Sequence, residues 1–275
     1  MMNLINFPNL EIRSLKDMEE NMKIFYQFKS NCFYTGPHLF RGHANHEWSI
    51  IPAIARTKKK PHELAAIEKE MVHEFISTMK SNGFGCYIRE KYLNAQYLDE
   101  WLMLQQAQHY GLPTRLIDWT YKENIAMAFA VLDSSMDNYD GAVFLFLGQH
   151  ESVLNHDSEY GYVDLNPYTI VKAGEFKIIL PNTHLDEQMN NVIGERRMSK
   201  QGGKFIIQDY ATSTLDLAEN SQFEKMLFKF IIPSDSKTAI RNEFAQLGVN
   251  QDTLYHAKID KIDYIVKILK DKYGV

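Results

Sequence analysis

The sequence predicts an α+β domain in which a helical part, about residues 1–135, precedes a strand-rich part, about residues 136–275. In the first part, apolar residues recur every three or four positions, which is the spacing of a helix that buries one face. In the second part, apolar residues form short continuous runs of strand length, such as AVFLFLG after Gly141. Because helices come first and strands cluster later, we expect one domain with a mixed or antiparallel sheet.

The spacing of apolar residues and the capping signals also place individual elements. Before residue 130 we expect helices at residues 14–30, after Pro61 and at residues 96–110, and a strand from His38 to Gly42. The later elements are strands in the segments FKIILP, KFIIQ and MLFKFIIP and helices at residues 235–247 and 260–271.

The bulk composition narrows the class of protein. The chain has 275 residues, of which 45% are hydrophobic, enough for a packed core. Its 30 basic and 35 acidic residues give a net charge of −5, which argues against broad, charge-driven binding to nucleic acid or to a membrane. Two cysteines without a paired motif, no signal-peptide pattern and no apolar run of ~20 residues lead us to expect a cytoplasmic protein.

The stretch from Gln105 to Ala130 carries the densest set of polar residues among apolar ones. Gly111, which can adopt a positive φ, is predicted to end the helix that leads into this stretch. The alternation of apolar and polar residues from Thr114 to Trp119 predicts a short strand. Thr120 and Glu123 have the spacing of a capping box, so a helix is expected to start at Thr120.

This arrangement places Arg115, Asp118 and Thr120 where a strand is followed by a helix, a position at which binding sites are often built. Each residue also has a structural interpretation. Arg115 and Asp118 could form an internal ion pair, and Thr120 could serve as a helix cap alone. Arg41 could pair with Asp118 or Glu47 and hold the early strand to the core.

Several motifs resemble those of the FRG-domain family. The first is Phe40-Arg41-Gly42, followed by Trp48 and Arg56. The most specific are QHYGLPTRLIDWT and ENIAMAFA, within the central stretch. The resemblance extends over roughly residues 38–258, with firm motifs between residues 38 and 130. It implies a family but no particular reaction.

In the order and spacing of its motifs, the chain also resembles ADP-ribosyltransferases more distantly. Such enzymes have Arg-Gly or His-Gly on an early strand, a Ser/Thr-containing strand before a helix ending in Ala-x-x-Phe, and a later strand preceded by a catalytic Glu. Arg41-Gly42 matches the first element, and Asp118-Trp119-Thr120 with AMAFA matches the second. The third would begin at Gln201, where this chain has Gln in place of Glu.

This resemblance implies a site for NAD, as substrate rather than as cofactor, and a role for each residue. Arg41 would hold phosphate or ribose, because a guanidinium matches phosphate oxygens at two points. Gly42 would hold the carboxamide, Tyr110 would stack on the nicotinamide ring, and Thr120 would position the ribose. Gln201 would face the scissile bond. The implied catalytic residues are Arg41, Thr120 and Gln201, and the implied binding residues are Gly42, His109, Tyr110, Arg115 and Asp118.

A glutamine at position 201 leaves two alternatives. Cleavage of the N-glycosidic bond builds positive charge on the ribose, which a carboxylate stabilises better than an amide. Either Gln201 serves binding while Asp118, Glu195 or Glu47 supplies the carboxylate, or the pocket binds a nucleotide without cleaving it.

Three functions follow from these residues. The first is ADP-ribosyl transfer to a protein or nucleic-acid acceptor, or hydrolysis of NAD, and by analogy it would suit a toxin or a phage-defence effector. The second is a non-catalytic module that binds a nucleotide or a nucleic-acid end in the same pocket. The third is phosphodiester chemistry by Asp118, His109 and Arg115, which lacks a carboxylate cluster. No metal-binding spacing and no membrane partner is predicted.

Overall fold

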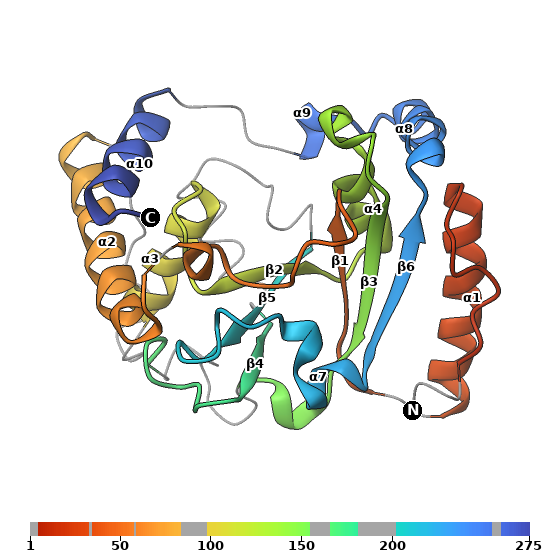
Figure 1. Ribbon diagram of the computed structural model, residues 1–275, viewed down its shortest axis with the longest axis horizontal. Helices are drawn as coiled ribbons and strands as arrows, with labels where there is room; N and C mark the ends of the chain where they lie inside the picture. Colours follow the sequence, from red (N-terminus) through yellow and green to blue (C-terminus); the bar gives the residue numbers. More distant parts are fainter. Residues whose placement is uncertain are drawn as a thin grey trace.

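The computed structural model describes residues 5–32, 35–57, 59–83, 98–154, 166–180, 202–254 and 260–275. Within these residues a single six-stranded sheet runs through the molecule in the order β4-β5-β2-β1-β3-β6, and all neighbouring strands are antiparallel (Figure 1). The strands are β1 (His38–His43), β2 (Leu116–Thr120), β3 (Gly141–Leu147), β4 (Phe176–Ile179), β5 (Gly203–Gln208) and β6 (Leu227–Ile232). The α+β class predicted from the sequence is therefore confirmed, and of the two predicted kinds of sheet, mixed or antiparallel, the protein has the antiparallel one.

The sheet is divided between β1 and β2. β1 pairs with β3 along its whole length, and β2 pairs with β5 in the same way. β1 and β2, however, share one register pair, Phe40 with Thr120. Figure 1 shows the two strands running in clearly different directions beyond this point. The backbone groups of β1 and β2 past the Phe40–Thr120 pair therefore need other partners.

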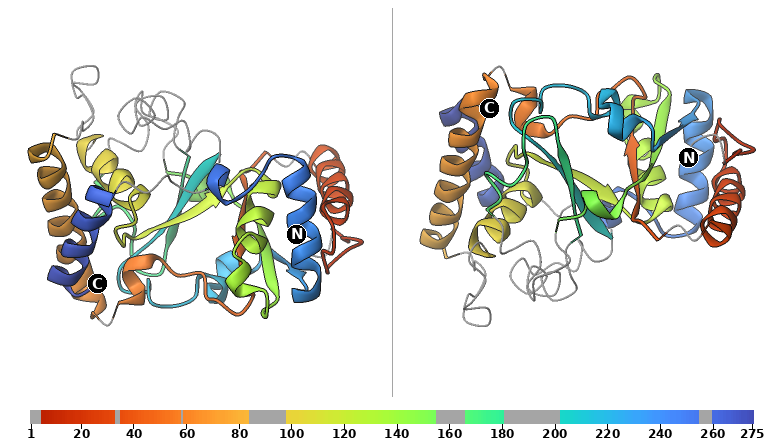
Figure 2. Two further views of the ribbon diagram at one scale, coloured as in Figure 1. Left: turned by 90° about the horizontal axis from the view of Figure 1, so that it is seen from above. Right: turned by 90° about the horizontal axis from the view of Figure 1, so that it is seen from below.

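The helices lie at two ends of this divided sheet (Figure 2). At one end, α1 (Leu15–Asn31) and α8 (Lys237–Gln246) accompany the β1-β3-β6 half, and α4 (Glu123–Val131) packs on β1 and β3. At the other end, α2 (Pro61–Ser81), α3 (Leu98–His109) and α10 (Asp260–Tyr273) pack together. The short helices α7 (Ser221–Glu224) and α9 (Gln251–Leu254) complete the described α-helices.

Two hydrophobic clusters follow from this arrangement, and β2 separates them. Ile117 and Trp119 belong to the cluster that includes α1, α4 and β3, whereas Leu116 belongs to the cluster that includes α2 and α3. Side chains alternate across a strand, so Asp118 and Thr120 face the same side as Leu116. Both polar residues therefore point toward the side on which α3 lies.

The sequence predicted most element positions. The predicted helix at residues 14–30 is α1, and Ser14 with Asp17 forms its capping box. The predicted helices after Pro61 and at residues 96–110 are α2 and α3. Gly111 follows α3 with a φ of 86°, as expected of a glycine that ends a helix.

The capping box predicted at Thr120 is wrong. Thr120 is the last residue of β2, where it pairs with Phe40 on one side and Gly203 on the other, so its backbone stays extended. α4 starts at Glu123 after Lys122, and no side chain caps it. The Thr120 hydroxyl instead accepts a hydrogen bond from the Lys122 amide at 3.0 Å.

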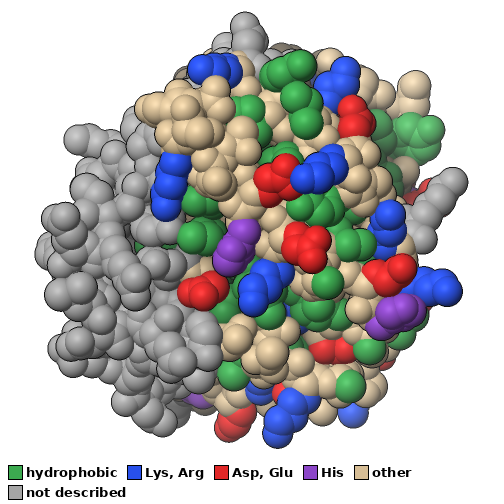
Figure 3. Space-filling view, turned by 90° about the vertical axis from the view of Figure 1, so that its left-hand side faces the viewer, with side chains coloured by type: hydrophobic (Ala, Val, Ile, Leu, Met, Phe, Trp, Pro, Cys, Tyr) green, Lys and Arg blue, Asp and Glu red, His purple; other side chains and the backbone are tan. Residues whose placement is uncertain are grey.

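The outer surface at the helical end carries mixed charge. Figure 3 shows acidic and basic side chains interspersed among apolar ones on the side that lies at the left of Figure 1. Lys272 of α10, for example, pairs with Glu74 of α2. Among the described helices, none has both the length and the apolar character that a membrane crossing requires.

Candidate functional site

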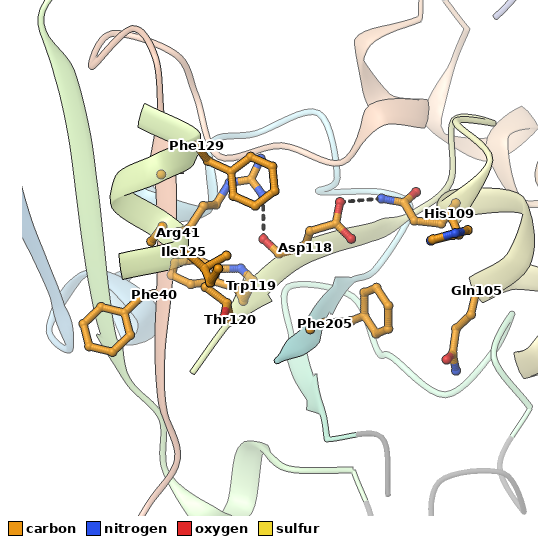
Figure 4. A pocket seen from close by; sticks show the side chains of 14 residues that line it. Phe40, Arg41, Gln105, His109, Asp118, Trp119, Thr120, Ile125, Phe129 and Phe205 are labelled. Carbon is orange, nitrogen blue, oxygen red and sulfur yellow. Dashed lines mark hydrogen bonds between the residues drawn. The ribbon is translucent and has the colours of Figure 1, made fainter. Parts of the chain in front are cut away.

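A cavity of about 320 Å³ opens where β1 and β2 separate (Figure 4). Its walls come from β1, β2, the start of β5, the end of α3 and the first turns of α4. The polar side chains that line it are Arg41, Gln105, Gln108, His109, Asp118 and Thr120. A volume of this size is at the small end of the range for ligand pockets.

The Arg41 side chain of β1 forms a hydrogen bond to the backbone of β2 in the region where the two strands do not pair. Its Nη1 donates a hydrogen bond of 2.5 Å to the backbone carbonyl of Asp118 on β2, and its Nε donates one of 2.8 Å to His43 Nε2. No described residue accepts a hydrogen bond from Nη2. Burial lowers the pKa of Arg41 to about 10, and the nearby Asp118 charge opposes this shift. The guanidinium is therefore a cation at neutral pH, with one edge open to the pocket.

His43 is held in one neutral tautomer. Its Nδ1 lies 3.1 Å from the Trp48 carbonyl, which can only accept, so Nδ1 carries the hydrogen. The other ring nitrogen, Nε2, then accepts from Arg41. Burial, followed by the Arg41 charge, lowers the pKa of His43 to about 3. The imidazole stays uncharged at neutral pH.

The Asp118 carboxylate faces the cavity and forms no ion pair with Arg41, whose guanidinium bonds the Asp118 carbonyl instead. Asp118 Oδ2 accepts a hydrogen bond from Gln108 Nε2 at 2.9 Å. The Thr114 hydroxyl donates to Gln108 Oε1 at 2.6 Å, which turns the Gln108 amide nitrogen toward Asp118. The Asp118 side chain is exposed to solvent. The protein atoms around its carboxylate nevertheless raise its pKa, although the Arg41 charge opposes this effect.

Aromatic side chains complete the walls of the cavity. Phe129 of α4 lies beside the Arg41 side chain, and Phe205 of β5 lies on the Asp118 side (Figure 4). Phe205 reaches this position because it pairs with Asp118 across the β2–β5 ladder. A pocket with ring faces on its walls and a few polar groups at fixed points suits a planar heterocyclic ligand.

The structure brings five of the eight residues implied by the resemblance to this cavity. Arg41, Gly42, His109, Asp118 and Thr120 all line it. Gln201 lies outside the described residues, as does Glu195. Gly203, two residues after Gln201, lines the cavity at the start of β5.

Tyr110 and Arg115 lie elsewhere. Neither residue lines the cavity, and Tyr110 packs against Phe75 of α2, with ring centroids 6.0 Å apart. Arg115 is fully buried, with its guanidinium 3.9 Å from the centre of the Tyr210 ring. The Arg115–Asp118 ion pair, one of the two interpretations of these residues, does not form, because residues three apart on an extended segment point to opposite sides.

Arg115 belongs to a buried polar cluster. Glu68 of α2 accepts hydrogen bonds from the Arg115 amide and, at 2.5 Å, from the Tyr210 hydroxyl. The Arg115 guanidinium donates to the Pro167 carbonyl. Burial raises the pKa of Glu68, and the Arg115 charge opposes it. This cluster joins α2 to the segment before β2, which is a structural role.

Gly42 has a packing requirement that the sequence did not reveal. A Cβ atom at this position would lie 1.8 Å from the Ala126 carbonyl oxygen of α4. The glycine therefore allows α4 to approach β1 closely and so shapes the wall that α4 contributes. Glu47 lines a second, open hollow of about 530 Å³ beside Trp48 rather than the cavity.

Sequence reasoning missed His43, Gln108 and Phe205. His43 lies two residues after Arg41 on a strand, so period-two alternation could have placed both side chains on one face. Gln108 lies in the most specific motif, but its contact with Asp118 depends on how the helix and the strand meet.

Within the described residues, no group of three or more His, Cys, Asp or Glu side chains is placed to hold a metal ion.

The comparisons with known proteins give one match. A family model described as FRG domain matches residues 36–139. This segment contains β1, β2, α3 and α4, and so supplies every wall of the cavity except the one from β5. No curated protein and no solved structure matches the chain.

Proposed function

Starting from the match of residues 36–139 to the FRG-domain model, we propose that the cavity between β1 and β2 binds NAD and that the protein cleaves its N-glycosidic bond. The observation that carries this proposal is the arrangement of Arg41 and Asp118. Their charged groups face one cavity without pairing with each other, so each is available to a ligand.

The guanidinium supports phosphate binding. Arg41 is anchored through Nε and Nη1, and its Nη2 edge is left for an anion. A phosphate oxygen at this edge would receive a charge-assisted hydrogen bond inside a partly dehydrated cavity. The ring faces of Phe129 and Phe205 suit a nicotinamide ring, and the small cavity volume suits the nicotinamide–ribose end of the dinucleotide.

Asp118 supports the chemical step. When the bond between ribose C1′ and the nicotinamide nitrogen breaks, the electron pair leaves with nicotinamide and positive charge develops on the ribose. The carboxylate, oriented by Gln108, would stabilise this charge. Water or an acceptor hydroxyl then bonds to C1′ and loses its proton. In this proposal Asp118 has the role that a Glu at position 201 would have in an ADP-ribosyltransferase.

Incubation of the purified protein with NAD, followed by chromatographic measurement of nicotinamide, tests the proposal. We expect nicotinamide release by the wild type and its loss in Arg41→Ala and Asp118→Asn. Arg13→Ala, which removes an exposed arginine paired with Asp235 on the α1 side, serves as the matched control and should retain activity. The proposal of cleavage fails if the folded wild-type protein leaves NAD intact over a wide range of enzyme concentration.

A non-catalytic nucleotide-binding module is the second candidate. One observation favours it: among the described residues that line the cavity, Asp118 is the only carboxylate. An increase in melting temperature with NAD or ADP-ribose, without nicotinamide release, would identify the binding module. A toxin or phage-defence role belongs to the first proposal as its biological setting and would be tested by expressing wild type and Asp118→Asn in cells and comparing growth.

A further inference from the structure

We infer that His43 is a positioning residue: it holds the Arg41 guanidinium so that its open edge faces the cavity rather than the Asp118 carboxylate. The choice of a nucleotide as the probe below rests on the proposed function, whereas the positioning of Arg41 by His43 does not depend on it.

The evidence is a continuous line of hydrogen bonds across β1. The Trp48 carbonyl accepts from His43 Nδ1, and His43 Nε2 accepts from Arg41 Nε. Arg41 Nη1 then donates to the Asp118 carbonyl on β2. These hydrogen bonds therefore fix two of the three guanidinium nitrogens: Nε is bonded to a residue of β1, and Nη1 is bonded to a residue of β2.

The chemistry of this line requires a neutral imidazole. Neutral histidine has one donor and one acceptor at different positions of its ring, whereas a protonated histidine has two donors. Only an acceptor can face the Arg41 Nε–H group. The ring is itself fixed, because it is 3% exposed and packs edge-on against Phe144, with centroids 5.1 Å apart.

The consequence concerns the separation of charges in the cavity. An arginine side chain has many rotamers, and an opposite charge nearby favours those that form an ion pair. Asp118 is close enough for its charge to act on Arg41. Without the bond to His43, the guanidinium would be free to turn toward the carboxylate, and a closed pair would leave neither group for a ligand.

The alternative is that His43 only fills space beside Phe144. Two substitutions separate these roles. His43→Gln keeps an acceptor at the end of the side chain, whereas His43→Phe keeps the ring and its packing but cannot accept from Arg41. Each is combined with Arg41→Lys, since lysine retains the charge but has no Nε–H group. Circular dichroism and thermal melting show which variants fold.

The first measurement is calorimetric titration with ADP-ribose. We expect His43→Gln to bind within about 3-fold of wild type and His43→Phe to bind about 10- to 100-fold more weakly, the range for loss of a hydrogen bond to a charged group. In the Arg41→Lys background, His43→Phe should change the affinity no further. Equal losses in both backgrounds, or full affinity in folded His43→Phe, would overturn the inference.

The second measurement needs no ligand and so separates this inference from the proposed function. The Nε–H signal of Arg41 is observed by ¹⁵N NMR and assigned by its absence in Arg41→Lys. We expect slow exchange with solvent in wild type and in His43→Gln, and fast exchange in His43→Phe. If wild type binds no ADP-ribose but shows this pattern, the proposed function fails and the positioning stands. If exchange is equally slow in His43→Phe, the positioning fails.

Discussion

Replacement of Gly42 by alanine should damage the cavity through the packing of α4. The new Cβ would lie 1.8 Å from the Ala126 carbonyl oxygen, whereas carbon–oxygen contacts are ordinarily about 3.3 Å or longer. The strand and the helix would therefore have to separate by about 1.5 Å, the difference between that ordinary contact and the built position.

Helix α4 is not free to retreat by this amount. The C-terminal end of α4 is held by two hydrogen bonds: Arg241 of α8 donates to the Val131 carbonyl at 2.7 Å, and Gln251 donates to the Leu132 carbonyl at 2.7 Å. Overpacking of a core costs about 1–3 kcal/mol, and a backbone-to-backbone clash belongs at the upper end of this range. With an unfolding entropy of about 2.1 cal/mol/K per residue, 3 kcal/mol corresponds to a fall in melting temperature of about 5 °C.

Differential scanning calorimetry measures this fall, and the matched control is Gly248→Ala. Gly248 has a φ of 73° but nothing within 4 Å of an added Cβ, so its substitution should cost about 1 kcal/mol from backbone strain alone and leave the cavity unchanged. Because α4 carries part of the cavity wall, Gly42→Ala should also weaken nucleotide binding. A Gly42→Ala variant that melts with the wild type and binds equally well would refute this reasoning.

Three further predictions concern ionisable side chains. Glu68→Ala should lower the free energy of unfolding by about 2–5 kcal/mol in urea denaturation, because it leaves two buried donors, the Arg115 amide and the Tyr210 hydroxyl, without their acceptor, at about 1–3 kcal/mol each; a loss below about 1 kcal/mol would contradict this. The pKa of Asp118 is raised on folding, so the charged carboxylate destabilises the fold once the pH rises above the pKa of the unfolded chain. Asp118→Asn should therefore raise the melting temperature at pH 7.5 and not at pH 3. The same substitution should abolish nicotinamide release. Folding lowers the pKa of His43 to about 3 and that of His38 to about 4, so both imidazoles bind protons more readily in the unfolded chain. Their contribution to stability is therefore complete above pH 6.5 and is lost as the pH falls from 6.5 to 3. At pH 4.5 the His43 contribution alone should be about 2–3 kcal/mol below its value at pH 7.5, and His43→Gln should show a pH dependence shallower by that amount in denaturant melts.

The sequence predicted the elements well because their signals are local. Apolar runs located β3 and β6, the capping box of Ser14 located α1, and Gly111 located the end of α3. The convergence of Arg41 and Thr120 on one cavity also followed from the order of motifs. The element predictions needed only residues within a few positions of one another, whereas the pairing of Arg41 with Thr120 was implied by the resemblance to ADP-ribosyltransferases.

The errors arose where long-range pairing decides the outcome. Thr120 has the spacing of a helix cap, but pairing on both sides keeps it in the strand. Arg115 has the charge of a phosphate-binding residue, but its place before β2 buries the guanidinium against the Tyr210 ring, where it donates to the Pro167 carbonyl. Phe205 enters the cavity because of the β2–β5 register. None of these contacts could be derived from local spacing, because each depends on which strands become neighbours.

In the proposed function, the cavity between β1 and β2 is a nucleotide site anchored by Arg41. Calorimetric titration of NAD into wild type, Arg41→Ala and the control Arg13→Ala tests it most directly, at low temperature and with nicotinamide measured in the same samples. We expect saturable binding by wild type and by Arg13→Ala, and binding weaker by at least about 10-fold in a folded Arg41→Ala variant, the loss of one charge-assisted hydrogen bond. Equal affinity of all three proteins, or no binding by the wild type, would contradict it.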